Sequence, residues 1–454
     1  MSQLNLIKST SGIRGIIGSG LTPQLATEYG AAFGSFLKSG KIVIGRDSRP
    51  SGEIFMPAVI AGLRAVGCDV INLGIVPTPT VEIAIKKLKA AGGICITASH
   101  NPSPWNALKF FNHTGEFITP AQYRQFSKIV DKKKYAYQPF DKIGGLINNE
   151  TMIDEHIKMT LAEKVINRPA IKRRKFKVVI DAINGAGSVA LPRLLEKLGV
   201  KVIEINCLGN GDFVHEPEPV GKNLAQLGRA VKKHKADLGL ACDPDADRLA
   251  LVDENGNPIG EELTLTIGVM AVLKKKSGPV VINLSTSKVT EEIARWFGAN
   301  CYYSKVGEAN VIETMTQRKG IIGGEGNGGV IYPSFHAGRD ALIAAALTLS
   351  LLAEEKQTLS GLVETFPKLY NIKTKAVLKD KALFLKKLAN FEKEAVKLVG
   401  KCKIDRRDGL RFDFQHGWFQ LRTSNTEPIY RLIAETDQAN LTDSIIKKVK
   451  KYFK

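Results

Sequence analysis

Hydrophobic positions recur along this chain with two periods, one typical of helices and one typical of strands. A helical face over 25–37 ends near Gly40, and a short apolar strand follows at 42–44. The same alternation predicts helices over 53–66 and 80–91 and strands at 69–73 and 94–97. Strands that alternate with helices are typical of α/β layers with parallel strands.

The alternation occurs twice more before the pattern changes. The second unit has strands and helices in the order 178–180, 188–198, 200–205, 225–235 and 237–241, and the third has them at 280–282, 288–297, 308–318 and 321–323. After about 371 come a helix over 381–399, strand-like segments around 410–421 and 429–435, and a basic amphipathic helix over 440–453. We therefore expect three similar α/β domains, at 1–150, 151–250 and 251–370, and a smaller α+β domain at 371–454.

Composition agrees with a globular chain and adds an unusual charge. The 454 residues are 44% hydrophobic and 24% charged, which excludes a disordered or collagen-like chain. The 65 Lys and Arg residues exceed the 45 Asp and Glu residues, so the net charge is +20. Such a surplus suits nucleic acid, an anionic membrane surface or a small anionic substrate. The lysines form short clusters along the chain, which favours solvated surface over a single nucleic-acid-binding arm.

The spacing of the cysteines and the length of the apolar runs bear on the compartment in which the protein is expected. The six cysteines form no C-x-x-C pair, so a disulfide framework is not indicated and the ligand spacing of a zinc site is absent. The N-terminal segment has no apolar core of signal-peptide length. The longest apolar run, 341–353, is too short to span a bilayer. We expect a soluble, cytoplasmic protein with reduced thiols and no membrane partner.

Each of the four predicted units carries one unusually polar loop. These loops lie at 97–102, 243–248, 324–329 and 422–428. Ligands of open α/β sheets bind beyond the carboxyl ends of the strands, so the placement of the first three loops points to chemistry.

The second loop has Asp at positions 243, 245 and 247. Three carboxylates at alternate positions need a neutralising partner, and a hard divalent cation is the natural one. The spacing imitates an EF-hand, but Arg248 stands where the sharp turn needs glycine, and strands flank the loop. We therefore exclude an EF-hand. A polar turn held by local bonds between Asp and the backbone remains the alternative.

The other three loops offer different chemistry. The third contains a G-x-G-x-x-G pattern without the helix that a dinucleotide fingerprint must open. Its glycines permit close backbone approach, and Glu325 and Asn327 can bond hydroxyls, although a glycine-rich turn without a ligand stays equally open. The first holds Ser99 and His100 but lacks the G-x-S-x-G elbow of α/β hydrolases. The fourth carries groups that bind phosphate, with an ordinary hairpin as the alternative: Arg422, Ser424, Asn425 and Thr426.

Taken in order, the four loops resemble those of the α-D-phosphohexomutase family, which includes phosphoglucomutases, phosphomannomutases and phosphoglucosamine mutases. Segments 10–15 and 45–49 resemble motifs of the family's first domain, so the resemblance covers nearly the whole chain. It implies three α/β domains with mixed sheets and a smaller C-terminal domain around a central cleft. It also implies an isomerase, an intramolecular phosphotransferase that interconverts hexose or hexosamine 6-phosphate and 1-phosphate through a phosphoserine and a sugar bisphosphate.

The resemblance assigns a role to the first two loops. Ser99 would carry the phosphoryl group, and Asp243, Asp245 and Asp247 would hold Mg²⁺ together with an oxygen of that phosphoserine. A phosphoserine carries about −1.5 to −2 charges at neutral pH, which Mg²⁺ would neutralise while it polarises the phosphorus. Glucose or hexosamine 1,6-bisphosphate would serve as the activator that phosphorylates the serine.

The resemblance also implies substrate-binding and proton-transfer groups. The sugar would meet Glu325 and Asn327, and its non-reacting phosphate would meet Arg422, Ser424, Asn425 and Thr426. The candidates for acid and base are His100, Lys109, Arg14 and Arg248. Of these four, we favour Lys109 and His100.

Departures from the family pattern bear on which sugar is bound. Types acting on glucose or mannose usually carry Ser at position 327 and His at positions 308 and 329, whereas this chain has Asn327, Glu308 and Gly329. These variants resemble archaeal-type phosphoglucosamine mutases, and an acidic Glu308 suits the ammonium of an amino sugar. A phosphoglucomutase or phosphomannomutase is the alternative. A phosphatase using water as acceptor and a basic nucleic-acid-binding protein are more remote readings. The expected partner is a small sugar phosphate and not nucleic acid, and the sequence does not choose between a monomer and a homo-oligomer.

Overall fold

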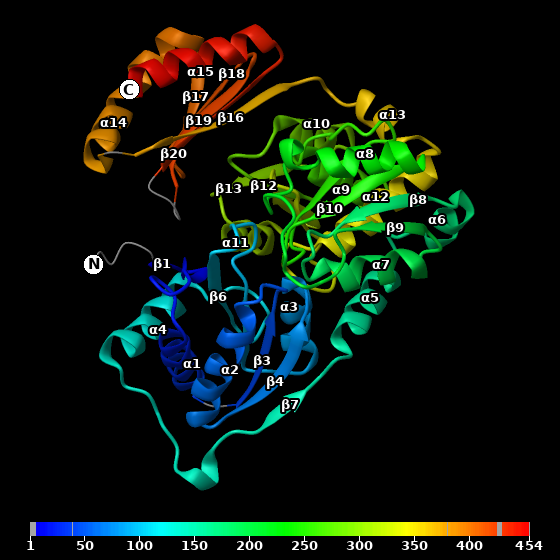
Figure 1. The fold of residues 1–454 in the computed structure, drawn as a ribbon. Coiled ribbons are helices and arrows are strands. Elements are labelled where there is room, and N and C mark those ends of the chain that lie inside the picture. Colours follow the sequence, from blue (N-terminus) through cyan, green and yellow to red (C-terminus); the bar gives the residue numbers. More distant parts are fainter. Residues whose placement is uncertain (1–5, 39, 379, 425–428, 454) are drawn as a thin grey trace.

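Four β-sheets follow one another along the chain and divide the structure into four parts (Figure 1). The computed structural model describes residues 6–38, 40–378, 380–424 and 429–453. The first three sheets have helices on their faces, and the fourth is antiparallel with its two helices on one side (Figure 1).

The first sheet combines parallel and antiparallel strands. Its order is β1 (Leu6–Ser9), β2 (Gly12–Ile16), β6 (Trp105–Phe111), β5 (Gly92–Ile96), β3 (Gly40–Arg46), β4 (Cys68–Ile75) and β7 (Leu146–Asn148). Strand β3 runs parallel to β5, so their carboxyl ends deliver loops 47–49 and 97–102 to the same edge, and β6 returns antiparallel beside β5. The helices are α1 (Pro23–Leu37), α2 (Gly52–Ala65), α3 (Thr78–Lys87) and α4 (Pro120–Lys132), and a short 3₁₀ helix, η1 (Phe140–Lys142), precedes β7.

The second sheet has the order β11 (Leu249–Val252), β10 (Leu238–Cys242), β8 (Lys177–Asp181) and β9 (Lys201–Ile205), with β11 antiparallel to β10. Its helices are α5 (Met152–Ala162), α6 (Arg168–Arg174), α7 (Gly187–Lys197) and α8 (Ala225–His234), with η2 (Gly221–Asn223) before α8. The boundary expected at 250 falls inside β11. Because β11 completes this sheet by pairing with β10, we place the boundary after Val252.

The third sheet has the order β13 (Cys301–Ser304), β12 (Val280–Asn283), β14 (Ile322–Glu325) and β15 (Gly329–Ile331), with β15 antiparallel. Its helices are α9 (Glu262–Leu273), α10 (Lys288–Trp296), α11 (Glu308–Arg318), α12 (Ala341–Glu355) and α13 (Leu359–Glu364). The long apolar run 341–353 forms most of α12, which is buried throughout that range. Among the described residues, no helix is both long and apolar enough to cross a membrane.

The fourth sheet is built of β16 (Tyr370–Val377), β20 (Ile429–Thr436), β19 (Gly417–Thr423), β18 (Leu410–Phe414) and β17 (Cys402–Asp405), in that order. Helices α14 (Lys381–Val399) and α15 (Ala439–Phe453) bury aromatic and aliphatic side chains against it. Other residues of this sheet face the third domain. Arg411 donates to the carbonyl oxygen of Leu284 at 2.6 Å, and Glu435 accepts from the backbone N–H of Lys288 at 2.7 Å.

The predicted fold class is confirmed, with three α/β domains whose sheets are mixed and a smaller C-terminal α+β domain. Some predicted elements were wrong in extent or missing. Helix α3 ends at Lys87 instead of 91, since Lys89 has a left-handed φ of 53°. Segment 410–421 is two strands, because the chain turns back at the positive φ of Gly417. Helix α9 had no amphipathic period to reveal it, because it is buried on most of its surface.

Candidate active site

Ser99 lies in the loop that leaves β5, and its backbone is held in a sharp turn. Its φ is +49°, in the left-handed region that serine rarely adopts, and its backbone N–H donates to Thr97 Oγ1 at 2.9 Å. The residue is only 3% exposed. The turn directs Ser99 Oγ toward the second domain, where it donates to Asp243 Oδ2 at 2.7 Å.

The loop after β3 fixes this turn from the side. Thr97 Oγ1 donates to Asp47 Oδ2 at 2.6 Å, and the Arg49 Nε donates to the same oxygen at 3.0 Å. The buried guanidinium of Arg49 also donates through Nη2 to the carbonyl oxygens of Ser99 (2.7 Å) and Asn101 (2.6 Å). The segment 45–49, noted in the sequence only as a motif, therefore supports the backbone of the serine loop.

The three aspartates of the second loop converge at the carboxyl end of β10. They are buried, and one carboxylate oxygen from each lies within 4.8 Å of the others. Asp243 Oδ1 accepts the backbone N–H groups of Asp247 and Arg248, each at 3.2 Å. Within the described part of the chain, Asp245 Oδ1 and Asp247 Oδ1 accept no hydrogen bond although both are buried. Buried carboxylate oxygens without a hydrogen bond suit a hard divalent cation.

Lys109 and Arg339 bring positive charge to this triad. Lys109 Nζ, from β6, donates to Asp245 Oδ2 at 2.6 Å and lies 3.5 Å from Asp247 Oδ2. Arg339 Nη2, from the segment before α12, donates to Asp247 Oδ2 at 2.6 Å. The aspartates therefore do not titrate alike. Burial together with Asp247 and Asp245 raises the pKa of Asp243, whereas for Asp245 the ammonium of Lys109 outweighs burial and lowers the pKa.

Glu325 in the third loop is tied into the same network. Its Oε1 accepts from Asn283 Nδ2 and from the backbone N–H of Gly307, both at 2.8 Å, and its Oε2 accepts from Arg339 Nη1 at 2.9 Å. Burial opposes ionisation here, but Arg339 prevails and the pKa of Glu325 is lowered. Asn327 lies beside it, with Nδ2 at 3.4 Å from Glu325 Oε2.

Glu308, at the start of α11, also faces Arg339. Its Oε1 accepts the backbone N–H of Arg339 at 3.0 Å, and its Oε2 lies 3.2 Å from Arg339 Nε. Arg339 thus joins Glu308 to two loops, the one at 243–248 (the metal-type loop) and the one at 324–329 (the sugar-type loop). Sequence reasoning missed this residue. The signal available was a charged pair, Arg339–Asp340, directly before the most apolar run of the chain.

The remaining acid and base candidates lie around Ser99. His100 Nδ1 is 3.4 Å from Ser99 Oγ, and burial, with Arg248 and Arg14, lowers the pKa of His100. Arg14 Nη1 donates to Asn101 Oδ1 at 2.5 Å, and burial lowers the pKa of Arg14 to about 10. Arg248 Nε lies 3.7 Å from Asp247 Oδ1.

The fourth loop is described only at its ends. Arg422 is the penultimate residue of β19, and its Nε is buried with no hydrogen-bond partner among the described residues. Burial lowers the pKa of Arg422, while the charges of Asp408 and Glu325 oppose that shift. The backbone N–H of Ser424 donates to the carbonyl oxygen of Ile429 at 2.9 Å. Asn425 and Thr426, also predicted to bind phosphate, lie outside the described residues.

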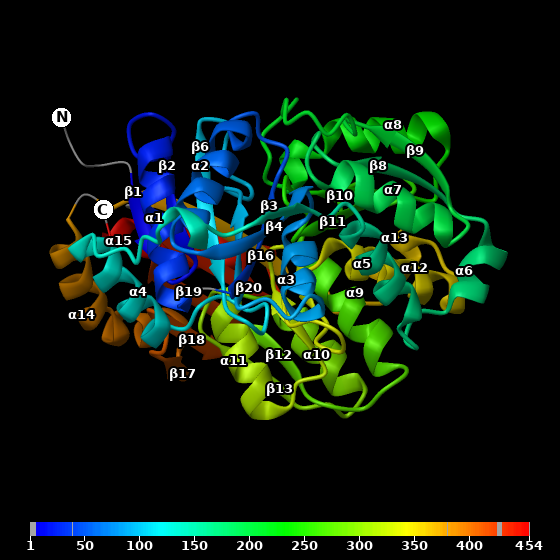
Figure 2. The ribbon, with the colours of Figure 1, turned by 90° about the horizontal axis from the view of Figure 1, so that it is seen from below.

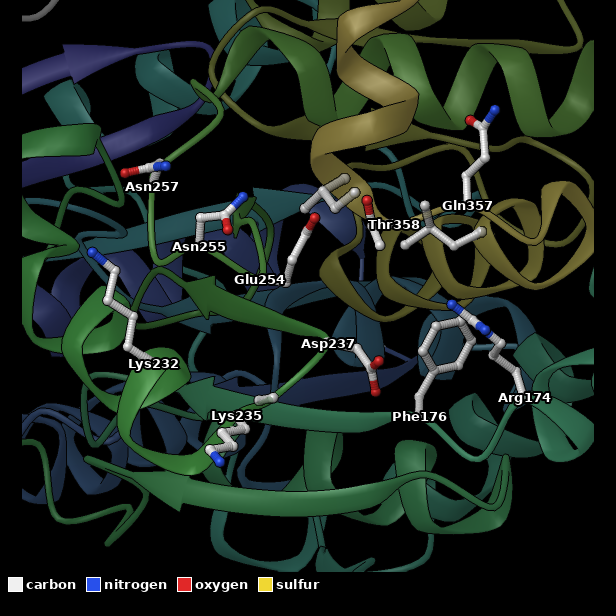
Figure 3. A pocket seen from close by; sticks show the side chains of 13 residues that line it. Arg174, Phe176, Lys232, Lys235, Asp237, Glu254, Asn255, Asn257, Gln357 and Thr358 are labelled. Atoms are coloured by element: carbon white, nitrogen blue, oxygen red, sulfur yellow. The ribbon is translucent and has the colours of Figure 1, made fainter.

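A separate pocket of about 760 Å³ lies at the other end of the second domain (Figure 3). Its lining includes Asp237, which precedes β10, whereas Asp243 follows that strand. Phe176, directly before β8, and Glu254, beyond β11, confirm the placement at this opposite edge of the sheet. The pocket is therefore not part of the Ser99 site.

Comparison with known proteins gives one consistent result. Family profiles described as phosphoglucomutase/phosphomannomutase match in order, with alpha/beta/alpha domains I, II and III over 5–137, 154–256 and 261–370 and the C-terminal domain over 372–451. A phosphoglucomutase/phosphomannomutase of Thermococcus kodakarensis is 38% identical over 438 residues, covering 94% of this chain and 93% of its own. A probable phosphoglucosamine mutase of Pyrococcus abyssi is 35% identical over 454 residues, covering 98% and 97%.

Solved structures agree with the sequence relatives. A phosphoglucomutase/phosphomannomutase family protein of Burkholderia thailandensis matches with a TM-score of 0.85 and 26% identity, over 98% of this chain and 97% of that one. The agreement in fold extends over all four domains, and the motif order found in the sequence is the order of the matched domains. The chain therefore belongs to the phosphoglucomutase/phosphomannomutase family, the α-D-phosphohexomutases.

Proposed function

We propose that this chain is a phosphohexomutase that moves a phosphoryl group between O6 and O1 of a hexosamine phosphate through a phosphorylated Ser99. The observation that carries the proposal is the contact between Ser99 Oγ and Asp243 Oδ2 at 2.7 Å, within a buried aspartate triad. Two oxygens of that triad have no hydrogen-bond partner among the residues that the structure describes. A buried serine beside such a triad is suited to accept and return a phosphoryl group.

The donor set fits Mg²⁺, because hard carboxylate oxygens converge next to the nucleophile. Asp243, Asp245 and Asp247 would hold it, together with an oxygen of the phosphoserine. When bound, Mg²⁺ supplies charge neutralisation and polarises the phosphorus. Lys109 Nζ forms an ion pair with Asp245 Oδ2 at 2.6 Å, which holds that carboxylate in place.

The chain's own residues then position the transfer. Arg49 fixes the carbonyl groups of the serine loop, which keeps the Ser99 side chain directed into the site. Most of the rate enhancement in phosphoryl transfer comes from positioning and charge stabilisation. We assign proton transfer to His100 and Lys109, because the His100 ring lies 3.4 Å from Ser99 Oγ and Lys109 reaches the triad from β6.

The sugar and its second phosphate are bound away from the serine. Glu325 and Asn327 would contact ring hydroxyls, and Arg422, Ser424, Asn425 and Thr426 would grip the phosphate that does not react. Arg422 offers a buried Nε without a partner in the described chain, which is suited to a bidentate phosphate contact. The sugar bisphosphate formed by the first transfer would reorient within the site, so that either phosphate can face Ser99. Glucose or hexosamine 1,6-bisphosphate would act as the activator.

The hexosamine preference rests on Glu308. This carboxylate stands where glucose- and mannose-type family members usually carry His, and it lies beside Glu325 through their shared partner Arg339. Two carboxylates at this place favour a substrate with an ammonium group. The names of the relatives differ in sugar, so phosphoglucomutase or phosphomannomutase activity is the second candidate. The proposed partner is the sugar phosphate alone, and the cytoplasmic location stays a prediction.

The test is a turnover panel with glucosamine, glucose and mannose 6-phosphates, each with a trace of the matching 1,6-bisphosphate and Mg²⁺. We expect isomer formation to be fastest with glucosamine phosphate, and to stop in EDTA and return with added Mg²⁺. Equal rates on all three sugars would contradict the hexosamine preference. Free phosphate released in place of isomer would indicate a phosphatase.

Variants of the serine loop test the mechanism. Ser99→Ala is expected to abolish turnover while thermal unfolding stays cooperative, because only the nucleophile is lost. Ser103→Ala, an exposed serine four residues on, is the matched control and should retain activity. Full activity of Ser99→Ala would contradict the assignment of Ser99 as the residue that carries the phosphoryl group.

A further inference from the structure

A second buried group of metal-ligating side chains lies where the first three domains meet. His156 comes from α5, and His336 and Asp340 come from the segment that leads into α12. Helix α3 contributes Thr80 and Glu82, and helix α5 lies between α3 and α12 and contacts both (Figure 2). We call these five residues the junction cluster. All five side chains are buried, and none belongs to the Ser99 site.

Two imidazole rings point at one carboxylate oxygen. His156 Nε2 lies 2.8 Å from Asp340 Oδ2, and His336 Nε2 lies 3.3 Å from the same atom. Ligand atoms of these three residues all lie within 4.8 Å of one another. The other oxygen, Asp340 Oδ1, accepts the backbone N–H of Leu342 at 2.7 Å, which fixes the orientation of the carboxylate.

Each outward-facing ring nitrogen lies near an oxygen of the kind that the second nitrogen of a metal-bound histidine uses. His156 Nδ1 lies 2.9 Å from Thr80 Oγ1, and His336 Nδ1 lies 3.3 Å from Glu82 Oε2. A histidine that binds a metal usually directs its second nitrogen at a carboxylate, a carbonyl or a similar acceptor. Gly338 leaves the room for this, because a Cβ there would lie 1.8 Å from Glu82 Oε2.

The cluster also gathers carboxylates and imidazoles in one buried place. Glu82 and Asp340 bring two carboxylates into a buried site, where they form ion pairs with the two imidazoles: Glu82 with His336, and Asp340 with both rings. Glu82 Oε2 and His336 Nδ1 are among the buried polar atoms without a well-formed hydrogen bond in the described chain. With both rings neutral, one divalent ion would balance the two carboxylates.

We propose that the junction cluster binds one divalent transition-metal ion of the zinc type through His156 Nε2, His336 Nε2 and Asp340 Oδ2. Two imidazoles and one carboxylate are ligands of Zn²⁺, whereas Mg²⁺ prefers oxygen ligands, so this ion differs from the one proposed beside Ser99. The ligands come from distant parts of the chain, which is why the sequence shows no zinc spacing. The ion would join the second and third domains directly, and the first domain through Glu82.

The direct test uses the untagged full chain, unfolded in a chelator and refolded with Co²⁺. Cobalt in a tetrahedral site of imidazole and carboxylate ligands absorbs visible light far more strongly than cobalt in an octahedral oxygen site. We expect one strongly absorbing ion per chain, displaced by one equivalent of Zn²⁺. The variant Asp245→Asn, which disrupts the triad beside Ser99, should keep that spectrum.

Substitutions within the cluster sharpen the test. His336→Gln and His156→Gln each remove a ligand and should abolish the tetrahedral spectrum. Glu82→Gln leaves all three ligands but loses the outer carboxylate, so we expect zinc to bind about 10–100-fold more weakly. The matched control is His416→Gln in the fourth domain, where a partly exposed histidine also faces an aspartate, Asp437.

The outcomes separate two states of the cluster. The proposal is overturned if the wild-type chain shows no tetrahedral cobalt spectrum and if all the zinc that it binds is lost in Asp245→Asn. The cluster would then be a hydrogen-bonded junction in which a proton shared by Glu82 and His336 balances the charge. An unchanged cobalt spectrum in His336→Gln would overturn it equally. The wild-type measurement decides even if a histidine variant fails to refold.

Discussion

Arg339 carries one positive charge into a group of three buried carboxylates, those of Asp247, Glu308 and Glu325. No motif marks this residue, but its guanidinium contacts the metal-type loop and the sugar-type loop at once. Arginine suits the place because its planar fork bonds several carboxylates in fixed directions. We regard Arg339 as a positioning residue, since it acts on substrate only through the carboxylates that it holds.

Replacing Arg339 with Met should destabilise the chain strongly. The change keeps most of the side-chain volume but leaves buried Glu308 and Glu325 without their cation. Asp247 keeps the more distant Lys109 and Arg248. Breaking a buried pair in this way costs about 3–5 kcal/mol. Denaturant unfolding measures the loss. The control is Arg295→Met on α10, an exposed arginine paired with Glu292, which should cost less than about 1 kcal/mol. Similar losses in both variants would contradict the role given to Arg339.

Arg49 positions the serine loop directly through backbone carbonyls, and indirectly through Asp47. Its Nη1 donates to the carbonyl oxygens of Pro102 (3.0 Å) and Trp105 (3.2 Å), in addition to the two bonds from Nη2. Arg49→Lys keeps the charge but loses the fork, so we expect kcat to fall by about 10²-fold with little change in KM. Steady-state kinetics on the best sugar phosphate measures both. Arg64→Lys, where a single Nε bond reaches the carbonyl of Gly144, is the control and should keep kcat.

At the scale of elements, strand direction explains why distant segments meet. Strands β3 and β5 are parallel neighbours, so the Arg49 loop and the Ser99 loop leave the same edge of the first sheet. Strand β6 returns antiparallel beside β5, and its pairing sets Lys109 opposite Cys95. Lys109 and Ser99, ten positions apart along the chain, therefore both reach the aspartate triad. Sheet register, not sequence spacing, determines this part of the site.

Strand β16 joins the fourth domain to the sugar-type loop through one lysine. Lys373 Nζ donates to the carbonyl oxygen of Gly326 and to Glu261 Oε1, both at 2.8 Å, and lies 2.7 Å from Glu262 Oε1. Burial raises the pKa of Glu262 to about 7, although Lys373 acts to lower it. The lysine thus offsets part of the cost of burying two carboxylates.

Lys373→Met should therefore change how stability depends on pH. A pKa raised above the unfolded value of 4.5 means that the folded state binds the proton more tightly, so the free energy of unfolding falls as pH rises toward 7. Without the cation the pKa of Glu262 rises further, and the fall should continue above pH 7 in the variant. Unfolding measured from pH 5 to 9 tests this. Lys397→Met, an exposed lysine paired with Glu394, should keep the wild-type profile.

At the scale of the whole molecule, the fourth domain is anchored to the third by a buried arginine. The Arg411 guanidinium lies 4.0 Å from the centre of the Trp418 ring and 4.7 Å from that of Tyr303, and it donates to the carbonyl oxygen of Leu284 at 2.6 Å. Cation–π contacts of this kind gain strength when they are shielded from water. This anchor joins the domain that carries Arg422 to the domain that carries Glu325.

Arg411→Ala should loosen the attachment of the fourth domain. We expect faster limited proteolysis between 356 and 380 and a higher KM for sugar phosphate, because the fourth domain, which carries Arg422, is held less firmly against the third. Mass spectrometry of the fragments locates the cleavage. Arg406→Ala, an exposed arginine paired with Glu392, is the control. Proteolysis unchanged in Arg411→Ala would show that other contacts hold the interface.

The basic residues that give the net charge of +20 fall into two groups in the structure. The lysine clusters at 132–134, 172–175 and 274–276 are exposed, as expected of solvated surface. Lys109 and Arg339 are instead buried against carboxylates of the site, where they balance negative charge. Surplus charge is therefore a property of the surface, and the chemistry of the site depends on a few paired cations.

The amino-acid sequence by itself determined the α/β class, the four-domain order, the family and the candidates Ser99, Asp243, Asp245 and Asp247. These follow from periodicity and from motifs of consecutive residues, which are local and survive without a fold. Only the tertiary structure decided that Arg339 and Lys373 hold the loops and that the junction cluster exists. Their partners lie up to hundreds of residues away along the chain, and strand register and burial bring them together. Local pattern specifies elements and motifs, whereas the pairing of buried charges is fixed only when the domains pack.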